Sequence, residues 1–278
     1  MRVRKVGMAL AGLAIASMSL AACAEEEAAS VADKDKLIIG VKYDQPSLGL
    51  KTGSGVEGFD IDVAKYIAGK MGVSESDIEF KETKSANRES FLANGTVDMV
   101  IATYSITEAR KPKVTFAGPT VVTHQDIMVR ADDTSITKLA DLKGKKVCAV
   151  AGSNSWKNIT EGPNKQNVKV AAETVPAQGY DDCMTKLKGK SLDAISTDAT
   201  ILAGFVNREG SAFKVVNSPF TDERYGVGLK KGDLKACEEI NKAISAMYDD
   251  GTAKKLWDKW FGKAGLPFEP KPAPEGCA

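Results

Sequence analysis

Polar and charged side chains in this sequence gather directly after segments that are expected to form strands. Arg88 follows a Ser-Ala-Asn turn, and Arg110 ends a run that starts at Thr103, just past a buried strand. Asp198 ends another expected strand, and the Gly-Ser-Asn-Ser run at 152–155 follows a third and opens a helix. Arginine binds a carboxylate bidentately, a helix N-terminus adds N–H donors for an anion, and a carboxylate accepts from an ammonium group. These residue types predict a site for a zwitterion.

The same strand ends carry further hydroxyl, amide and cationic groups. Each candidate also has a structural interpretation: the arginines and Lys42 could be solvated surface charges, and Asp198 or the serines could only cap a helix. Tyr43 and Phe59 could be core residues or a lid over a ligand. The candidate binding residues are Lys42, Ser85, Arg88, Thr103, Ser105, Arg110, Ser153, Asn154, Ser155 and Asp198.

The elements that would position these side chains alternate between strand and helix. A helical stripe of apolar residues at 60–71 ends before Gly72, and it follows a β-rich run at 37–41. This alternation predicts an α/β architecture with mostly parallel sheets. The other expected strands end at 195 or cover 97–102, 147–150 and 213–216, and the other expected helices cover 88–93, 200–206, 234–248 and 252–261.

A weak internal repeat indicates two halves of similar design. Residues 92–98 and 187–193 both run from a helix end through a glycine into a strand that begins near an aspartate. The strands then end at Thr103 and Asp198, and ligands of such sheets bind beyond the carboxyl ends of the strands. The tail at 265–274 is rich in proline and is expected to lie along the surface.

The N-terminus has the pattern of an export signal. Three basic residues within 2–5 precede an uncharged apolar stretch at 7–20, which is shorter than the roughly 20 residues that span a membrane. Small residues before Cys23 resemble a bacterial lipobox. We expect 1–22 to be a signal peptide, Cys23 to carry the acyl chains, palmitate among them, and 23–35 to be a tether on the membrane's outer face. An ordinary signal peptide that carries a cysteine is the alternative.

Charge and histidine content exclude two classes of protein. The chain has 38 basic and 37 acidic side chains, and removal of 1–22 leaves 35 and 37. These charges are interspersed without a basic stripe, which argues against a nucleic-acid-binding protein. One histidine and the lack of a Cys-x-x-Cys motif argue against a metal site, and no cofactor motif is present.

Four cysteines follow Cys23, and in an exported chain an even number favours disulfides. Four cysteines allow three pairings, and free buried thiols are a further alternative. The simplest choice pairs near neighbours, Cys148 with Cys183 and Cys237 with Cys277.

The motifs taken together resemble the polar-amino-acid solute-binding proteins of ABC importers, bacterial extracellular solute-binding family 3, over the whole mature length. They include the Gly58-Phe59-Asp60 turn, Thr103-x-Ser105-x-x-x-x-Arg110, the 152–155 run, Asp198, and Asp250-Gly251 before Trp257-x-x-Trp260-Phe261. The opening at 40–46 and the 85–88 turn are most similar to lipid-anchored glutamate-binding members of actinobacterial type.

The resemblance implies a periplasmic-binding-protein-like fold with two lobes and a hinge of two crossing strands, near 119–124 and 217–221. Lobe 1 would comprise 36–120 with 221–278, and lobe 2 would comprise 121–220. The resemblance further implies that Arg110, with Thr103 and Ser105, binds an α-carboxylate, that Ser153 to Ser155 add donors, and that Asp198 takes the α-ammonium. A second carboxylate would need Arg88 and Lys42.

The implied function is capture of L-glutamate, or of aspartate or glutamine, by a monomer that delivers it to ABC-transporter permease subunits. The main alternative is an enzyme on the same fold, similar to cyclohexadienyl dehydratases. It is disfavoured because the sequence has no H-E-x-x-H, no G-x-S-x-G and no phosphate loop.

Overall fold

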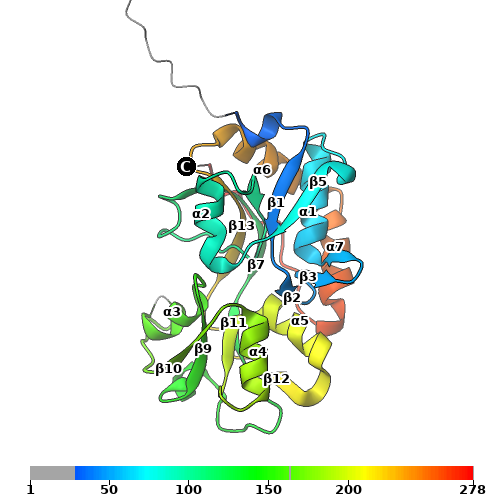
Figure 1. The fold of residues 1–278 in the computed structure, drawn as a ribbon. Helices are drawn as coiled ribbons and strands as arrows, with labels where there is room; N and C mark the ends of the chain where they lie inside the picture. Colours follow the sequence, from blue (N-terminus) through cyan, green and yellow to red (C-terminus); the bar gives the residue numbers. More distant parts are fainter. Residues whose placement is uncertain (1–28, 163, 278) are drawn as a thin grey trace, which may run out of the picture.

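The protein consists of two α/β lobes stacked end to end, as the computed structural model in Figure 1 shows. The structure describes residues 29–162 and 164–277. The predicted signal peptide, the lipidation site at Cys23 and the first part of the tether therefore lie outside the described residues.

Lobe 1 is built on a five-stranded sheet in the order β5-β1-β6-β13-β7. The first three of these strands are parallel, and β13 pairs antiparallel with both β6 and β7. The bounds are β1 Leu37–Val41, β5 Ile78–Glu82, β6 Met99–Val100, β7 Val114–Thr123 and β13 Glu223–Lys230. A second, small antiparallel sheet comprises β2 Asp44–Gln45, β3 Gly49–Thr52 and β4 Gly55–Glu57.

The helices of lobe 1 are α1 Phe59–Lys70, α2 Arg88–Ala93, α6 Leu234–Asp249 and α7 Thr252–Phe261. Helix α1 starts after Gly58, whose φ is +138° and whose missing Cβ would lie 2.1 Å from the carbonyl oxygen of Leu48. Only glycine fits there. Phe59 then packs its ring against Trp257 and Phe261, with centroids 5.9 and 5.6 Å away. Phe59 is therefore a core residue and not a lid over a ligand.

Lobe 2 contains the parallel pair β9 and β10 and the antiparallel sheet β11-β8-β12. A parallel bridge between Val147 and Ala194 joins the two into one layer. The bounds are β8 Gln125–Arg130, β9 Lys146–Val150, β10 Glu173–Ala177, β11 Ile195–Asp198, β12 Phe213–Val215, α3 Ser155–Thr160, α4 Tyr180–Lys188 and α5 Ala199–Glu209. Short 3-10 turns cover Val31–Asp33, Glu75–Asp77, Ser85–Asn87, Leu139–Leu142, Gly210–Ala212 and Gly262–Ala264.

The chain crosses between the lobes twice, and the first crossing lies where the sequence predicts it. Strand β7 ends at Thr123 and β8 begins at Gln125, with His124 between them. The second crossing differs in detail from the prediction, because residues 217–221 form no strand. Asn217 has a φ of +59° and interrupts the extended backbone, and strand pairing resumes where Glu223 faces Thr123. The two-lobed α/β architecture is confirmed, and the division into 36–120 with 221–278 and 121–220 stays a prediction.

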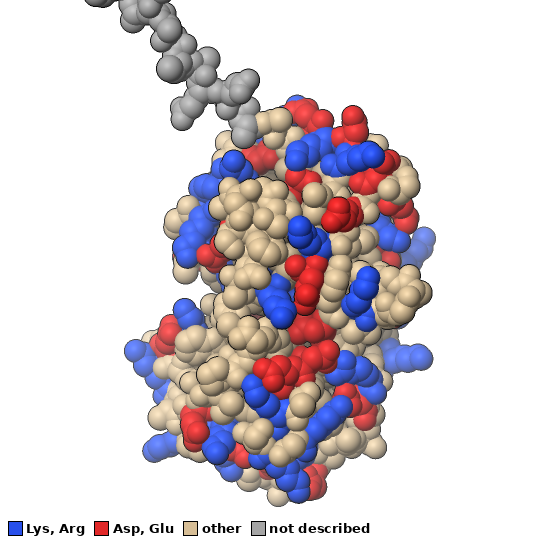
Figure 2. All heavy atoms as spheres, viewed as in Figure 1, with Lys and Arg blue, Asp and Glu red and all other residues tan. Residues whose placement is uncertain are grey.

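Both disulfides form in the pairing that the sequence favours. Cys148–Cys183 joins β9 to α4, and Cys237–Cys277 joins α6 to the end of the tail. The tail packs on lobe 1, since Trp257 Nε1 donates to the carbonyl of Leu266 at 3.1 Å. Within the described ranges, no helix is both long and apolar enough to cross a bilayer. The face drawn in Figure 2 carries interspersed basic and acidic side chains on both lobes.

Candidate functional site

A small cavity with a free volume of about 20 Å³ lies between the two lobes, where strands of both sheets end. Every predicted binding residue except Lys42 lines it, and Tyr180 and Ile201 complete the wall. The lining residues are Ser85, Arg88, Thr103, Ser105, Arg110, Ser153, Asn154, Ser155, Tyr180, Asp198 and Ile201.

Two arginines form the lobe 1 side of this cavity. Arg88 is 3% exposed and Arg110 is 7% exposed, so neither is a solvated helix charge. Both guanidinium groups lie over the ring of Tyr104, at 4.2 and 5.0 Å from its centroid. This aromatic face attracts cations and holds the two groups side by side.

The hydrogen-bond acceptors of the two arginines in the described structure are backbone carbonyl oxygens. Arg88 donates to the carbonyls of Ser85, Ala102, Thr103 and Gly152 at 3.1–3.3 Å, and Arg110 donates to those of Ser105 and Gly152 at 2.7 and 3.2 Å. Burial and the charge of Arg110 lower the pKa of Arg88 to about 9, and burial lowers the pKa of Arg110. Two buried like charges with neutral acceptors favour an anion between them.

Lys42 lies behind this wall and not on it. The Lys42 ammonium is 4% exposed and donates to the carbonyl of Thr83 at 3.2 Å and to Oγ of Ser85 at 2.8 Å. Burial, followed by repulsion from Arg88, lowers its pKa well below the usual value. Lys42 thus reaches the cavity through Ser85, which lines it.

The lobe 2 wall is a network of hydroxyl groups centred on Tyr180. Its phenol oxygen lies 3.2 Å from Oγ of Ser153 and 3.1 Å from Oγ of Ser155, and it accepts from Oγ1 of Thr197 at 2.6 Å. The backbone N–H of Ser155 donates to Oγ of Ser153 at 3.1 Å. Ser153 thus has the local capping role that was the alternative for it, but its hydroxyl also faces the cavity.

Asp198 supplies the carboxylate of the cavity. It precedes α5 as the N-cap residue, yet its side chain makes no capping hydrogen bond and instead accepts from Tyr225 Oη at 2.6 Å. The simple capping interpretation is therefore wrong. Burial, followed by repulsion from Glu223, raises the pKa of Asp198 to about 8, while the Tyr225 hydroxyl and Arg110 oppose the rise.

The two lobes touch across this site. The carbonyl of Gly152 in lobe 2 accepts from both Arg88 and Arg110 in lobe 1, and the N–H of Tyr180 donates to Oδ2 of Asp44 at 2.8 Å. A Cβ on Gly152, whose φ is +73°, would lie 2.5 Å from the backbone nitrogen of Ala86. The Gly152 turn therefore needs glycine both for its backbone and for the close approach of the lobes.

Sequence reasoning missed several polar residues around the cavity. Tyr180 follows β10, so the strand-end argument would have found it, but Pro176 inside that strand hides the β pattern. Tyr225 and Glu223 lie on β13, which was not predicted. Tyr104 is inside a quoted motif but was not assigned a role.

The Cys148–Cys183 disulfide joins the two elements that carry the hydroxyl network, because β9 leads into Ser153 and α4 begins with Tyr180. Replacing both cysteines with serine is expected to weaken ligand binding about tenfold and to lower the free energy of unfolding by about 2–4 kcal/mol. The matched control is the Cys237→Ser/Cys277→Ser pair, which should cost similar stability but change the affinity by less than about threefold. Calorimetric titration measures the affinities of both double variants, and thermal unfolding measures their stabilities. An equal loss of affinity in the two double variants would contradict the role of the Cys148–Cys183 disulfide.

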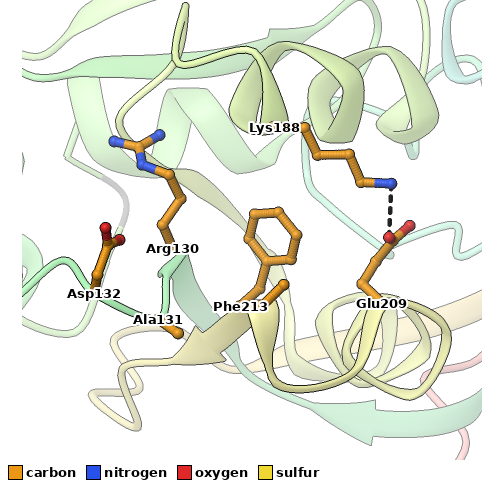
Figure 3. A pocket seen from close by; sticks show the side chains of 7 residues that line it. Arg130, Ala131, Asp132, Lys188, Glu209 and Phe213 are labelled. Carbon is orange, nitrogen blue, oxygen red and sulfur yellow. Dashed lines mark ion pairs between the residues drawn. The ribbon is translucent and has the colours of Figure 1, made fainter.

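A second hollow lies on lobe 2 (Figure 3), and three of its charged side chains, Arg130, Lys188 and Glu209, have partners within the protein. Arg130 donates to the carbonyls of Leu187 and Leu192 at 3.1 and 2.7 Å, and Lys188 pairs with Glu209 at 2.6 Å. These contacts tie the end of α4 to β8 and α5. Nothing in the described ranges groups histidine, cysteine and carboxylate side chains as a metal would require.

Comparison with known proteins identifies the family. Residues 37–263 match the bacterial extracellular solute-binding proteins, family 3. The chain is 38% identical to the glutamate-binding protein GluB of Corynebacterium glutamicum over 95% of this chain and 93% of that one. It is 37% identical to the ABC transporter glutamine-binding protein GlnH of Bacillus subtilis over 84% of both.

Among solved structures, an ancestral arginine-binding protein bound to glutamine superposes with a TM-score of 0.75 at 35% identity, over 82% of this chain and 99% of that one. This superposition agrees with the two lobes described above. The relatives are named for binding rather than for catalysis, which supports a binding protein over the enzyme alternative. The chain is a solute-binding protein that belongs to the bacterial extracellular solute-binding proteins, family 3.

Proposed function

We propose that this protein is an exported amino-acid-binding protein, lipid-anchored through Cys23, that captures L-glutamate between its lobes for an ABC importer. The observation that carries the proposal is that two buried arginines, Arg88 and Arg110, line one cavity. Within the described residues, their guanidinium groups donate only to backbone carbonyl oxygens. A ligand with two carboxylates supplies one anion for each. The names of the relatives, which include glutamate- and glutamine-binding proteins, support the same ligand class.

Each end of glutamate has a matching group. Arg110, with the Thr103 and Ser105 hydroxyls, would bind the α-carboxylate, while Ser153, Asn154 and Ser155 add donors from lobe 2. Asp198 would accept from the α-ammonium. Arg88 and Ser85 would bind the side-chain carboxylate of glutamate, and Lys42 lies behind Ser85. Charge-assisted hydrogen bonds of this kind contribute roughly 1.5–3 kcal/mol each.

Ligand capture would close the lobes because the proposed partners come from both. Arg88 and Arg110 belong to lobe 1, whereas the serines and Asp198 belong to lobe 2. A ligand that contacts both sets binds the closed state more tightly than the open state and shifts the population toward it. The closed lobes would then present one composite surface to the permease.

The test is a calorimetric titration of residues 29–278 with glutamate, aspartate, glutamine and arginine at pH 7.4. One-site binding of glutamate, with glutamine at least about tenfold weaker, is the expected result. Preference for glutamine or arginine would contradict the role of Arg88 and retain the α-carboxylate site. Absence of binding for all four would overturn the proposal.

Binding should release a proton, because burial between the lobes raises the pKa of Asp198 to about 8. Asp198 is then largely protonated at pH 6, and a ligand ammonium favours its ionised form. Affinity for glutamate should therefore rise by up to tenfold per pH unit from pH 6 and level off above pH 8. Titration in phosphate and in Tris would show the proton as a buffer-dependent enthalpy.

The control for this pH dependence is Asp198→Asn, which cannot ionise. It should bind more weakly at every pH and show a flatter slope between pH 6 and 8. If the wild-type protein releases no proton, Asp198 is already ionised before the ligand enters, and the linkage is wrong.

A further inference from the structure

Thr103 has a backbone conformation that its side chain disfavours. Its φ is +45°, and for a β-branched residue the left-handed region is a strained outlier that surrounding contacts must hold in place. Thr103 follows β6, is 8% exposed and lines the cavity between the lobes. Strain at this position requires a specific restraint nearby.

The restraint is the carboxylate of Asp60. The N–H of Thr103 donates to Oδ2 of Asp60 at 3.0 Å, and Asp60 itself is 4% exposed. Asp60 is the second residue of α1 and does not line the cavity. Burying a carboxylate costs free energy unless the carboxylate accepts hydrogen bonds. In the described structure, the Asp60 carboxylate accepts its hydrogen bond from the backbone N–H of Thr103. Thr103 Oγ1 also lies 2.8 Å from the carbonyl oxygen of Ala102 and 3.1 Å from Oε1 of Gln45, and its hydroxyl can donate to either, which supports the same conformation.

The backbone conformation of Thr103 determines the orientation of three groups that contact the arginines. Its carbonyl accepts from Arg88 at 3.1 Å, the next residue is Tyr104, whose ring lies under both guanidinium groups, and the one after is Ser105, whose carbonyl accepts from Arg110 at 2.7 Å. A relaxation of φ at Thr103 to negative values would redirect all three. The contact to Asp60 is therefore placed to control the geometry of both arginines.

We propose that Asp60 is a positioning residue that fixes the left-handed backbone of Thr103 and thereby sets the affinity and the carboxylate selectivity of the cleft. This inference rests on the proposed function, and it extends it to a residue that the ligand does not touch. Burial raises the pKa of Asp60 to about 7, while the Thr103 N–H and Lys42 favour its ionised form. The contact should therefore be strongest when Asp60 is charged.

The experiment measures glutamate and glutamine binding by calorimetry for Asp60→Ala, for Thr103→Gly and for the double variant. Asp60→Ala is expected to weaken glutamate binding about tenfold or more and to narrow the ratio between the two affinities. In the Thr103→Gly background the same change should have a clearly smaller effect, because glycine adopts a φ of +45° without strain. A purely structural role of Asp60 would not produce this coupling.

Asp62→Ala is the matched control. Asp62 lies on the same helix, but its carboxylate accepts from Lys259 and Trp260 at 2.7 Å, away from the cavity. It should leave both affinities within about twofold. Where circular dichroism shows that Asp60→Ala is unfolded, Asp60→Asn takes its place. The neutral amide oxygen of asparagine is a weaker acceptor than a carboxylate. Asp60→Asn should therefore weaken glutamate binding in the same way as Asp60→Ala, but by a smaller factor.

Two results would overturn the inference: equal losses for glutamate and glutamine, or an Asp60 effect that is the same with Thr103 and with Gly at 103. The wild-type titration separates this inference from the proposed function. If the wild-type protein binds a different amino acid, the glutamate assignment fails, and the coupling between Asp60 and Thr103, measured with that amino acid, still decides this inference. A wild-type protein that binds none of them overturns both.

Discussion

Replacing Arg110 with alanine is expected to weaken binding of every amino acid by about 30-fold to several thousand-fold, which corresponds to about 2–5 kcal/mol. Every such ligand has an α-carboxylate, and Arg110 is a buried cation that lines the cavity together with Thr103 and Ser105 and donates to the carbonyl of Ser105. Its removal would leave that carboxylate desolvated without a charged partner. The guanidinium also donates to Gly152 across the cleft, so the closed state itself loses a contact.

The measurement is a titration of wild-type and Arg110→Ala protein with glutamate, glutamine and aspartate. Arg208→Ala is the control, because Arg208 pairs with Asp181 and Glu209 on the outside of lobe 2 and has no contact to the cavity. Arg208→Ala should leave all affinities within about twofold. Unchanged binding in Arg110→Ala, or a loss restricted to glutamate, would contradict the α-carboxylate role.

The strand-end argument recovered most of the cavity because it depends on local sequence and one general rule. The periodic run at 60–71 and the helices near 234 and 252 agree with α1, α6 and α7 within one or two residues. Where strand and helix follow each other with a turn between them, the residue after the strand is confined to the carboxyl edge of the sheet. Arg110, Asp198 and Ser153 were placed in this way.

The remaining parts of the site depend on contacts between distant segments. Strand β13 pairs with β6 and β7, which lie more than 90 residues earlier in the sequence, so the local sequence did not show that Glu223 and Tyr225 lie around the cavity. Lys42 shows that the strand-end argument can also assign a residue to the cavity that does not line it. It follows β1 as predicted, but only the packing shows that it ends on Ser85 and the carbonyl of Thr83 instead of in the cavity.

The charged side chains that line the cavity are two cations from lobe 1 and one carboxylate from lobe 2, and this arrangement supports the proposal that a zwitterion with an extra carboxylate binds there. Lobe 1 contributes Arg88 and Arg110, with Lys42 behind them, and Asp198 faces them from lobe 2. Burial lowers the pKa of each of these three cations and raises the pKa of Asp198. In each case burial disfavours the charged form, and a ligand group of opposite charge would favour it.

Replacing Arg88 with alanine is expected to weaken glutamate binding by about 100-fold and glutamine binding by less than about tenfold. Arg88 also donates to Gly152 across the cleft, so a small loss common to both ligands is expected from weaker closure. The additional loss for glutamate comes from its side-chain carboxylate, which would be buried without a cation. The ratio of the two affinities is therefore the quantity that reports on selectivity.

Two further variants define the cause. Arg88→Lys keeps the charge but loses the planar fork and should fall between wild type and alanine for glutamate. Lys84→Ala removes an exposed cation from the same turn and should leave the ratio unchanged. If Arg88→Ala weakens glutamate and glutamine equally, Arg88 serves closure alone, and the second carboxylate must be bound through Ser85 and the ammonium of Lys42 behind it.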